Sequence, residues 1–255
     1  MAKVKKERID RLLVERELVE SRARAKARLM AGDVFVDGQR VDKAGTRVSV
    51  ESSIEMRGDE MPFVSRGGLK LDSALEQFDL EVKDRIAIDV GASTGGFTDC
   101  LLQRGVQKVY AVDVGYGQLA WRLRQDERVV VLERENIRHL PQESVEELCS
   151  LAVIDCSFIS LDLVLPNTLR FLSEEADVVA LIKPQFEVGR ERLGKGGVVR
   201  DQDARREAID DIIESADALG LRFVDGIDCP VHGPAGNVEY LAWFSRESSP
   251  PDPVG

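Results

Sequence analysis

Two charged residues stand directly behind apolar runs that predict buried β-strands. Asp155 follows the run 152–154, and Lys183 follows the run 179–182 and precedes a proline that ends it. Folding alone does not require a charge there, because burying one without a partner costs free energy. Ligands of open α/β sheets bind at the carboxyl ends of the strands. Both side chains are therefore candidates for proton transfer or for stabilising charge on a ligand.

A glycine-rich loop indicates a cofactor site. It runs from Gly91 to Gly96 behind the apolar run 86–90, and Asp113 ends the next apolar run 22 residues after Gly91. Glycines let a ligand approach the backbone, and an acidic residue about 20 positions further on can bind ribose hydroxyls. Ser93 replaces the middle glycine of the dinucleotide fingerprint G-x-G-x-x-G, so no pyrophosphate cradle is present. S-adenosylmethionine, which has a ribose and no phosphates, fits better.

Parts of this cofactor can be assigned to residues at the strand ends. The loop should line the methionine and the ribose, Asp113 should bind the ribose hydroxyls, and Asp155 should lie nearest the methyl group. Asn136, behind the third apolar run, is a candidate for the adenine, although turns use asparagine equally often. The predicted cofactor-binding residues are Asp89, Gly91, Ala92, Ser93, Thr94, Gly95, Gly96, Phe97, Asp113, Asn136 and Asp155.

The elements that position these residues form an α/β pattern. Seven strand-like runs alternate with helical stretches as far as the sixth run, which predicts a doubly wound, mostly parallel sheet. A short loop without a helix joins the last two runs, so these should pair antiparallel. A helix from residue 65 onward carries Lys70, and Glu239 lies on the last run. The runs cover residues 86–90, 109–113, 129–132, 151–156, 178–183, 222–227 and 238–244.

The amino-terminal fifth of the chain differs in charge from the rest. Residues 1–50 hold 13 Lys and Arg against 8 Asp and Glu, a net charge of +5 (13 − 8), whereas the whole chain carries −11. The remainder therefore carries −16 (−11 − 5). An acidic body with a basic end indicates a polyanionic partner.

Short elements fill this basic end. A helix should begin behind Ser21, a good N-cap, and stop at Gly32. Asp37 and Gly38 form a type I′ hairpin signal between two short strands, and another strand is expected at 47–50. The inner face of the helix is expected to consist of Ala23, Ala27 and Met30.

The composition excludes several classes of protein. Four cysteines stand far apart without a C-x-x-C pair, and the chain has two histidines. This pattern indicates reduced cysteines, a cytoplasmic protein and no metal site. No apolar run approaches the roughly 18 residues of a membrane helix, so we expect no membrane span.

The basic end resembles the S4 domain, the RNA-binding module named after a protein of the small ribosomal subunit. The segments 8–13, 21–25 and 31–38 and the residue Lys43 carry the resemblance, which spans nearly all of residues 7–57. It implies that the second helix and the hairpin present a basic surface to structured RNA, whose phosphates they position without reading sequence. The implied RNA contacts are Arg8, Arg11, Arg22, Arg24, Arg28 and Lys43, to which we add Arg66 in the body.

Lys70, Asp155, Lys183 and Glu239, in this order on this fold, resemble the tetrad of the FtsJ-like 2′-O-ribose methyltransferases. The segments 65–71, 89–99, 155–161 and 183–187 are more similar still to one branch, the haemolysin-named TlyA family, which couples an S4 domain to this catalytic domain. The resemblance extends from residue 7 to about 245. It implies S-adenosylmethionine-dependent 2′-O-methylation of cytidine in the ribosomal RNA of assembled subunits.

These resemblances divide the chain into four parts. The expected partner is ribosomal RNA within ribosomal subunits, with no metal, and a monomer is favoured. The parts are an S4-like RNA-binding domain at 1–57, a linker at 58–64, a class I methyltransferase domain at 65–247 and a disordered tail at 248–255.

Methyl transfer to a ribose requires that the weakly acidic 2′-hydroxyl lose its proton, and Lys183 is our candidate base. An ordinary lysine is protonated at neutral pH. A sulfonium cation and Lys70 would favour an uncharged Lys183, whereas Asp155 and Glu239 would favour a charged one. Lys183 is therefore either the base or a cation that binds the developing oxyanion, and Lys70 would hold the phosphate or ribose of the RNA.

Two other functions compete with this interpretation. A base-directed RNA methyltransferase would carry [Asn/Asp]-Pro-Pro-aromatic where this chain reads Asp-Cys-Ser-Phe from Asp155, and it would not need two lysines. A non-catalytic assembly protein or a membrane-active protein would leave the glycine loop and the four charged residues without a purpose. The sequence identifies neither the target nucleotide nor the subunit that carries it.

Overall fold

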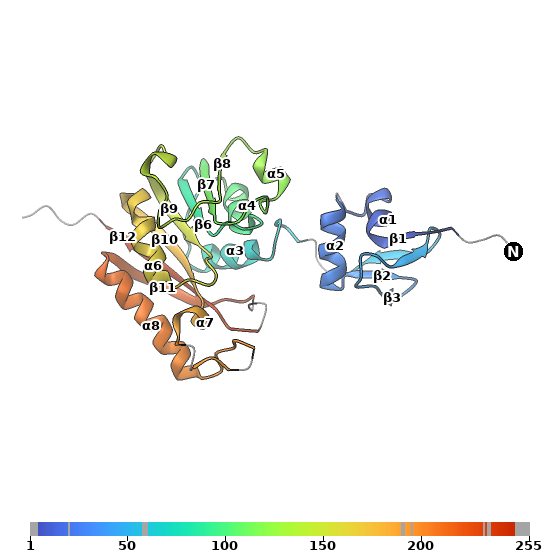
Figure 1. Cartoon of the computed structure of the whole chain (residues 1–255). Helices are drawn as coiled ribbons and strands as arrows, with labels where there is room; N and C mark the ends of the chain where they lie inside the picture. The colour runs from blue at the N-terminus through green and yellow to red at the C-terminus, as the bar shows by residue number, and fades with distance from the viewer. Residues whose placement is uncertain are drawn as a thin grey trace, which may run out of the picture. The chain divides into compact units, whose positions relative to one another are not determined.

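The computed structural model describes residues 5–19, 21–57, 61–189, 192–194, 196–231, 233 and 236–247. The chain forms two compact units, Met1–Glu60 and Met61–Gly255, and each has a hydrophobic core of its own (Figure 1). The division falls inside the linker predicted at 58–64. The side chain of Phe63, also in that segment, is buried in the core of the second unit. The predicted tail at 248–255 lies outside the described residues.

Short elements make up the amino-terminal unit. β2 pairs antiparallel with β3 and β5, and β1 pairs antiparallel with β4. Ser21 caps α2 by accepting a hydrogen bond from the backbone of Arg24, and Gly32 ends the helix with a φ of 83°. Asp37 and Gly38, both with positive φ, form the predicted hairpin turn. The elements are β1 (Lys6–Arg8), α1 (Ile9–Glu15), α2 (Arg22–Ala31), β2 (Val34–Val36), β3 (Gln39–Arg40), β4 (Arg47–Ser49) and β5 (Ile54–Met56).

One expectation for this unit is wrong. Met30 is 69% exposed, because α2 instead buries Ala25 and Leu29, which lie one turn apart on the face that joins the core. The side chains of Ala23 and Ala27 lie outside the described residues. The polar stretch behind residue 50 contains β5, which pairs with β2 through backbone groups and needs few apolar side chains to do so.

A seven-stranded sheet forms the centre of the second unit, with the strand order β11-β12-β10-β9-β6-β7-β8. β12 runs antiparallel to both neighbours, β10 and β11, and the pairs among the other strands are parallel. The predicted fold class and the antiparallel terminal pair are therefore confirmed. The strands are β6 (Ile86–Val90), β7 (Lys108–Asp113), β8 (Val129–Glu133), β9 (Cys149–Ile154), β10 (Leu172–Ile182), β11 (Leu221–Asp228) and β12 (Tyr240–Arg246).

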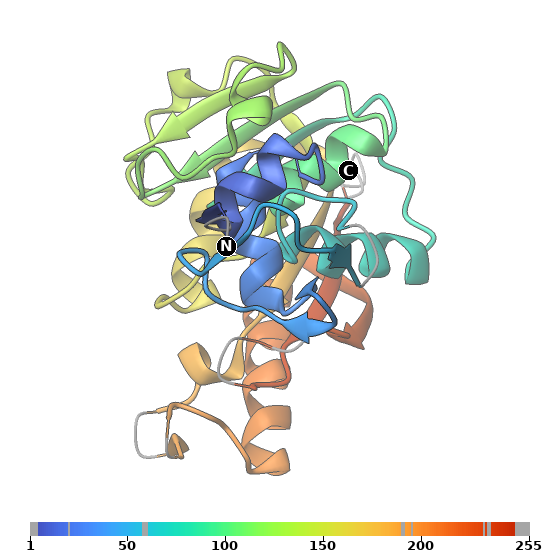
Figure 2. The same ribbon diagram turned by 90° about the vertical axis from the view of Figure 1, so that its right-hand side faces the viewer.

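Helices cover both faces of this sheet, as expected of parallel strands that are apolar on both sides. α3 (Gly67–Gln77), α4 (Gly96–Gln103) and α5 (Trp121–Arg124) pack on one face. α6 (Leu161–Thr168) and α8 (Gln202–Ala218) pack on the other. α8, drawn in orange, lies beside β11 (Figures 1 and 2). The remaining short helices are η1 (Gln142–Ser144), η2 (Leu169–Phe171) and α7 (Pro184–Glu187).

The direction of β12 determines where its first residues lie. Tyr240 at the start of β12 pairs with Ile182 at the end of β10. Glu239 and Lys183 therefore meet at the edge where the parallel strands end, although 56 residues separate them (239 − 183). None of the described helices combines the length and the hydrophobicity of a membrane span.

Candidate active site

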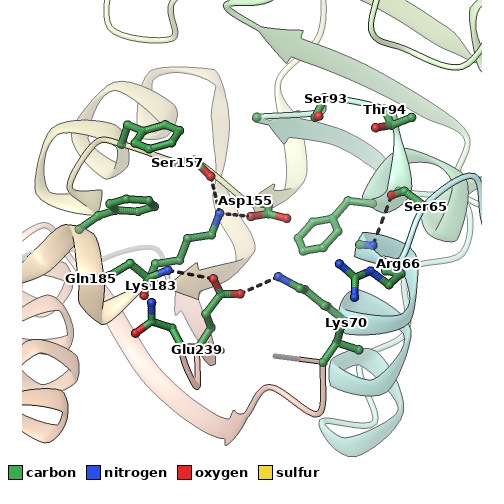
Figure 3. Close-up of a pocket in the computed structure, with 18 of the residues that line it drawn as sticks. Ser65, Arg66, Lys70, Ser93, Thr94, Asp155, Ser157, Lys183, Gln185 and Glu239 are labelled. Atoms are coloured by element: carbon green, nitrogen blue, oxygen red, sulfur yellow. Dashed lines mark hydrogen bonds and ion pairs between the residues drawn. The ribbon is translucent and has the colours of Figure 1, made fainter. Parts of the chain in front are cut away.

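A cavity of about 660 Å³ opens where the parallel strands end. All four residues of the predicted tetrad line it, together with Arg66 and most of the glycine loop (Figure 3). The tetrad comes from four different elements: α3, the end of β9, the end of β10 and the start of β12. The remaining lining residues include Ser65, Ser157, Phe158, Gln185, Phe186 and Asn237.

Lys183 contacts two side chains of the cavity. It is 6% exposed, and its Nζ lies 2.6 Å from Oδ1 of Asp155. The same nitrogen donates a hydrogen bond to Oγ of Ser157 at 2.8 Å. Both partners come from the turn that follows β9, so this turn sets the position of the Lys183 nitrogen (Figure 3).

Lys70 and Glu239 form the second pair. Nζ of Lys70 lies 2.6 Å from Oε2 of Glu239, which is 1% exposed. The other oxygen, Oε1, accepts a hydrogen bond from Nε2 of Gln185 at 3.1 Å. Burial would lower the pKa of Lys70, but the carboxylates of Asp155 and Glu239 outweigh burial and raise that pKa above its ordinary value. Lys70 is therefore a cation at neutral pH.

The glycine loop packs directly against the start of α3. A Cβ atom on Gly96 would lie 2.3 Å from Oγ of Ser65 and 2.8 Å from the backbone nitrogen of Gly68. Gly91 has a φ of 89°, and a Cβ there would lie 2.6 Å from the carbonyl oxygen of Asp155. Only glycine fits at either position without displacing backbone or neighbouring atoms.

Four predicted cofactor residues do not line the cavity. Asp89 is fully buried and faces α4, where Thr98 donates a hydrogen bond to its Oδ2 at 2.6 Å. Burial raises the pKa of Asp89 to about 7, and its Oδ1 has no hydrogen-bond partner. Asp89 does not line the cavity, and its contact with the cofactor stays a prediction. At Gly95, with φ of 96°, a Cβ would collide with Leu123, so this glycine serves packing.

Asp113 and Asn136 hold backbone turns near the loop. The Asp113 carboxylate accepts hydrogen bonds from the backbone nitrogens of Ser93 at 2.8 Å and Gly115 at 2.6 Å. It therefore fixes the glycine loop to the end of β7, and each oxygen keeps a lone pair for a ribose hydroxyl. Asn136 accepts hydrogen bonds from the backbone and the side chain of Arg138, which is the turn role that we set against adenine binding.

Two aromatic rings stand at the mouth of the cavity. Phe158 is 90% exposed, and its ring centroid lies 5.0 Å from that of Phe186. Phe158 also has a φ of 64°, in the left-handed region that non-glycine residues rarely occupy. A large apolar ring that is both exposed and strained indicates a function other than folding.

Basic residues of the amino-terminal unit are organised by carboxylates. Asp10, 4% exposed, accepts two hydrogen bonds from Arg8 and two from Arg22. Hydrogen bonds from Arg8 hold the pKa of Asp10 well below its usual range despite burial, and Arg22 acts in the same direction. Arg11 pairs with Glu7, and Arg28 pairs with Asp33. Arg24 is partly exposed, and Lys43 and Arg66 are exposed.

Three polar residues of the site were not predicted from the sequence. Ser157 and Gln185 hold the two lysine–carboxylate pairs, as described above. Asn237, 4% exposed, accepts a hydrogen bond from the backbone nitrogen of Val199 and donates one to the carbonyl of Gly197, both at 3.0 Å. Each stands two residues from a tetrad member (Asp155, Lys183 or Glu239), and this spacing was the available signal. Among the described residues, no three His, Cys, Asp or Glu side chains gather as metal ligands would.

The sheet order, the glycine loop and the four converging charges define a class I methyltransferase site of the FtsJ-like type. The model described as FtsJ-like methyltransferase matches residues 63–246, and the model described as S4 domain matches residues 7–54. The chain therefore belongs to the FtsJ-like methyltransferases and, with its S4 domain, to the haemolysin-named TlyA family within them.

Individual relatives agree with this assignment over most of their length. YqxC of Bacillus subtilis (strain 168), whose name groups it with the rRNA methyltransferases, is 49% identical over 93% of this chain and 85% of its own. The 16S/23S rRNA (cytidine-2′-O)-methyltransferase TlyA of Mycobacterium tuberculosis (strain ATCC 25618 / H37Rv) is 47% identical over 94% and 90%. A solved structure of a hemolysin-named protein from Streptococcus thermophilus is 44% identical, covers 97% of this chain and 91% of that chain, and superposes with a TM-score of 0.76.

Proposed function

We propose that this chain transfers a methyl group from S-adenosylmethionine to the 2′-oxygen of a cytidine in ribosomal RNA. The observation that carries the proposal is the convergence of Lys70, Asp155, Lys183 and Glu239 on one cavity that the glycine loop also lines. The TlyA relative, similar over nearly the whole chain, is named for this reaction on 16S and 23S rRNA.

The cavity fits the proposed cofactor in size and in chemistry. Its volume lies within the roughly 300–1,000 Å³ typical of small-molecule sites. Gly91 and Gly96 leave space for backbone contact with a ligand, Asp113 would accept ribose hydroxyls, and Asp155 would lie at the methyl end. The bound cofactor would supply an electrophilic methyl group on a sulfonium, and the electron pair of the broken carbon–sulfur bond would remain on sulfur.

Lys183 would act on the 2′-hydroxyl of the target ribose. In its uncharged form, the Nζ lone pair would take the hydroxyl proton as the oxygen attacks the methyl carbon. In its charged form, a free N–H would stabilise the negative charge that develops on the oxygen, and the hydroxyl proton would pass to solvent water. Asp155 orients this nitrogen in both cases, at a distance of 2.6 Å.

Lys70 and Glu239 would hold the RNA beside Lys183. The raised pKa of Lys70 keeps it cationic, as an interaction with a phosphate or a ribose oxygen requires. Glu239 fixes the direction of that cation, because Gln185 holds its second oxygen in place.

Phe158 and Phe186 would receive the base of the target nucleotide. Sequence-specific RNA enzymes commonly stack an unpaired base on aromatic side chains. Phe158 is the most exposed of the large apolar side chains in the described part of the chain, and it stands at the rim of this cavity.

The S4 domain would bind the RNA of the ribosomal subunit. Arg8, Arg11, Arg22, Arg24, Arg28 and Lys43 supply the positive charge, and Arg66 adds a cation at the cavity. We place the reaction in the cytoplasm, where assembled subunits are available, and expect a monomer.

The decisive experiment incubates the protein with unmodified small and large ribosomal subunits and labelled S-adenosylmethionine. Mass spectrometry of RNA fragments then locates the methyl group, with Lys183→Ala as the inactive variant and Lys108→Ala, outside the cavity, as the matched control. We expect label on a cytidine 2′-oxygen that falls about 10³-fold in Lys183→Ala. Label on a base would identify a base-directed enzyme. Tight RNA binding without transfer would identify an assembly protein.

A further inference from the structure

The nitrogen of Lys183 has a fixed number of bonding positions. An uncharged amine has two N–H donors and one lone pair, and an ammonium has three N–H donors. Ser157 accepts a hydrogen bond from this nitrogen at 2.8 Å. Asp155 forms an ion pair with it, with 2.6 Å between the nitrogen and Oδ1, but Oδ1 lies outside hydrogen-bond geometry. No other side chain or backbone atom of the described residues forms a hydrogen bond or ion pair with this nitrogen. At least one position therefore remains for a ligand in either protonation state.

The turn behind β9 is built to bring Ser157 to this nitrogen. Asp155 and Ser157 flank Cys156, whose thiol donates to the carbonyl of Val90 and so fixes the turn to β6. Phe158, the next residue, has the strained φ of 64°. Figure 3 shows Ser157 and Asp155 approaching the Lys183 nitrogen from the same turn, with the cavity beside them. Strained backbone of this kind is retained where it positions functional groups.

We propose that Ser157 is a positioning residue for Lys183, an inference that rests on the proposed methyl transfer. A single acceptor would leave the flexible lysine side chain free to swing about one contact. A counterion and a hydrogen-bond acceptor on one turn hold the nitrogen at one point, so a remaining bonding position faces the cavity. There it meets the 2′-oxygen, either as the lone pair that takes the hydroxyl proton or as the N–H that binds the oxyanion. The rate of such a step depends on how accurately the reacting atoms are oriented at a separation of about 3 Å.

Enzyme kinetics test this role with three variants. Ser157→Ala removes the acceptor, Ser157→Thr restores a hydroxyl, and Ser215→Ala on α8 is the control outside the cavity. We expect Ser157→Ala to lower the single-turnover rate on ribosomal subunits about tenfold. Its KM for subunits, affinity for S-adenosylmethionine and Tm should match those of the control, and Ser157→Thr should recover most of the rate. An unchanged rate in Ser157→Ala, or a loss shared equally by rate and cofactor affinity, would overturn the proposal.

A second measurement does not depend on methyl transfer. Competitive acetylation of the full chain by acetic anhydride, read by mass spectrometry, reports how well each lysine amine is held. Loss of Ser157 should increase acetylation of Lys183 and leave Lys108 unchanged. If wild-type protein methylates no subunit, the proposed function fails, whereas acetylation still decides whether Ser157 holds Lys183. Equal acetylation of Lys183 in wild type and Ser157→Ala would refute the contact itself.

Discussion

Burying a lone lysine costs free energy unless it loses its proton or gains a counterion. Lys70 and Lys183 are 9% and 6% exposed, and each has a carboxylate oxygen 2.6 Å from its nitrogen. Removing one partner of a buried pair leaves an uncompensated charge, whereas replacing both partners is often neutral or stabilising. The two pairs are therefore explained by chemistry on a ligand better than by stability.

A double-mutant cycle on Lys70 and Glu239 separates these roles. Glu239→Gln should lower the free energy of unfolding by about 3 kcal/mol, because Lys70 loses its counterion. Lys70→Met combined with Glu239→Gln should return to within about 1 kcal/mol of wild type, since neither position of this pair then carries a charge. Neither protein should transfer methyl groups at the wild-type rate. Urea unfolding measures the cycle, and additive losses in the double variant would contradict this account.

Because Asp89 is buried, we expect the free energy of unfolding to depend on pH. Burial raises its pKa from the ordinary 3.8 to about 7, so the unfolded chain ionises first as pH rises. The folded state then binds more protons, and stability falls between pH 4 and 7 and stays lower above. The pKa difference corresponds to a loss of about 4 kcal/mol in the free energy of unfolding above pH 7. Replacing the Asp89 carboxylate by a buried amide would recover only part of this loss. Asp89→Asn should therefore gain about 2 kcal/mol at pH 8 and little at pH 4.

The exposed Asp79 supplies the matched control for this measurement. Asp79→Asn should leave the free energy of unfolding unchanged at both pH values, because its side chain is exposed to water in the folded and the unfolded state. If Asp89→Asn gains the same stability at pH 4 and at pH 8, the ionisation of Asp89 is not the cause of that gain.

At the scale of elements, the cofactor loop and the start of α3 form one packed junction. Gly96→Ala should push Ser65 and Gly68 away from the loop, because the new Cβ has 2.3 Å and 2.8 Å to their nearest atoms. We expect a loss of about 1–3 kcal/mol in stability and about tenfold in affinity for S-adenosylmethionine by calorimetry. Gly45→Ala, whose Cβ finds its nearest atom at 3.9 Å, is the control. Unchanged affinity in Gly96→Ala would exclude the junction from cofactor binding.

A carboxylate organises the basic surface of the S4 domain. Asp10→Asn removes the charge that holds Arg8 and Arg22, whose distances to the carboxylate oxygens begin at 2.9 Å and 2.7 Å. We expect a loss of about 1–3 kcal/mol in stability and a severalfold weaker affinity for ribosomal RNA in filter binding, although the net positive charge increases. Asp42→Asn, at an exposed position, should instead bind RNA at least as well as wild type. Stronger binding by both variants would show that charge matters and orientation does not.

Helices and strands could be predicted where the residues that determine them lie within a few positions of each other in the sequence. Ser21, Gly32 and the Asp37–Gly38 turn act within a few residues, and the structure confirms all three elements that they predict. The exposure of Met30 depends on which face of α2 the neighbouring elements cover, and the prediction that it faces inward was wrong. Asp155 and Lys183 could be anticipated because each directly follows an apolar run, and Lys70 and Glu239 through the resemblance to the FtsJ-like tetrad. The sequence marks Ser157 and Gln185 only by their spacing of two residues from a tetrad member, since their contacts depend on the exact turns behind β9 and β10.

At the scale of the whole molecule, the charge is divided between a basic RNA-binding domain and an acidic body. Lys43→Ala should weaken RNA binding uniformly across sequences and reduce the slope of log K against log salt by about 0.7–0.9. Lys83→Ala, on the acidic body, is the control with the same loss of charge. Equal slopes for Lys43→Ala and wild type would remove Lys43 from the RNA contacts.

The insertion of β12 between β10 and β11 also has a consequence for the timing of synthesis. Lys70, Asp155 and Lys183 leave the ribosome in sequence order, at about 5–20 residues per second, but Glu239 reaches its place only when β12 has entered the sheet. A nascent or truncated chain that stops before residue 240 would therefore have the S4 domain, which is made first, but no β12 to hold Glu239 beside the other three charges. The chain thus becomes able to catalyse the reaction in one late step, after β12 has been synthesised.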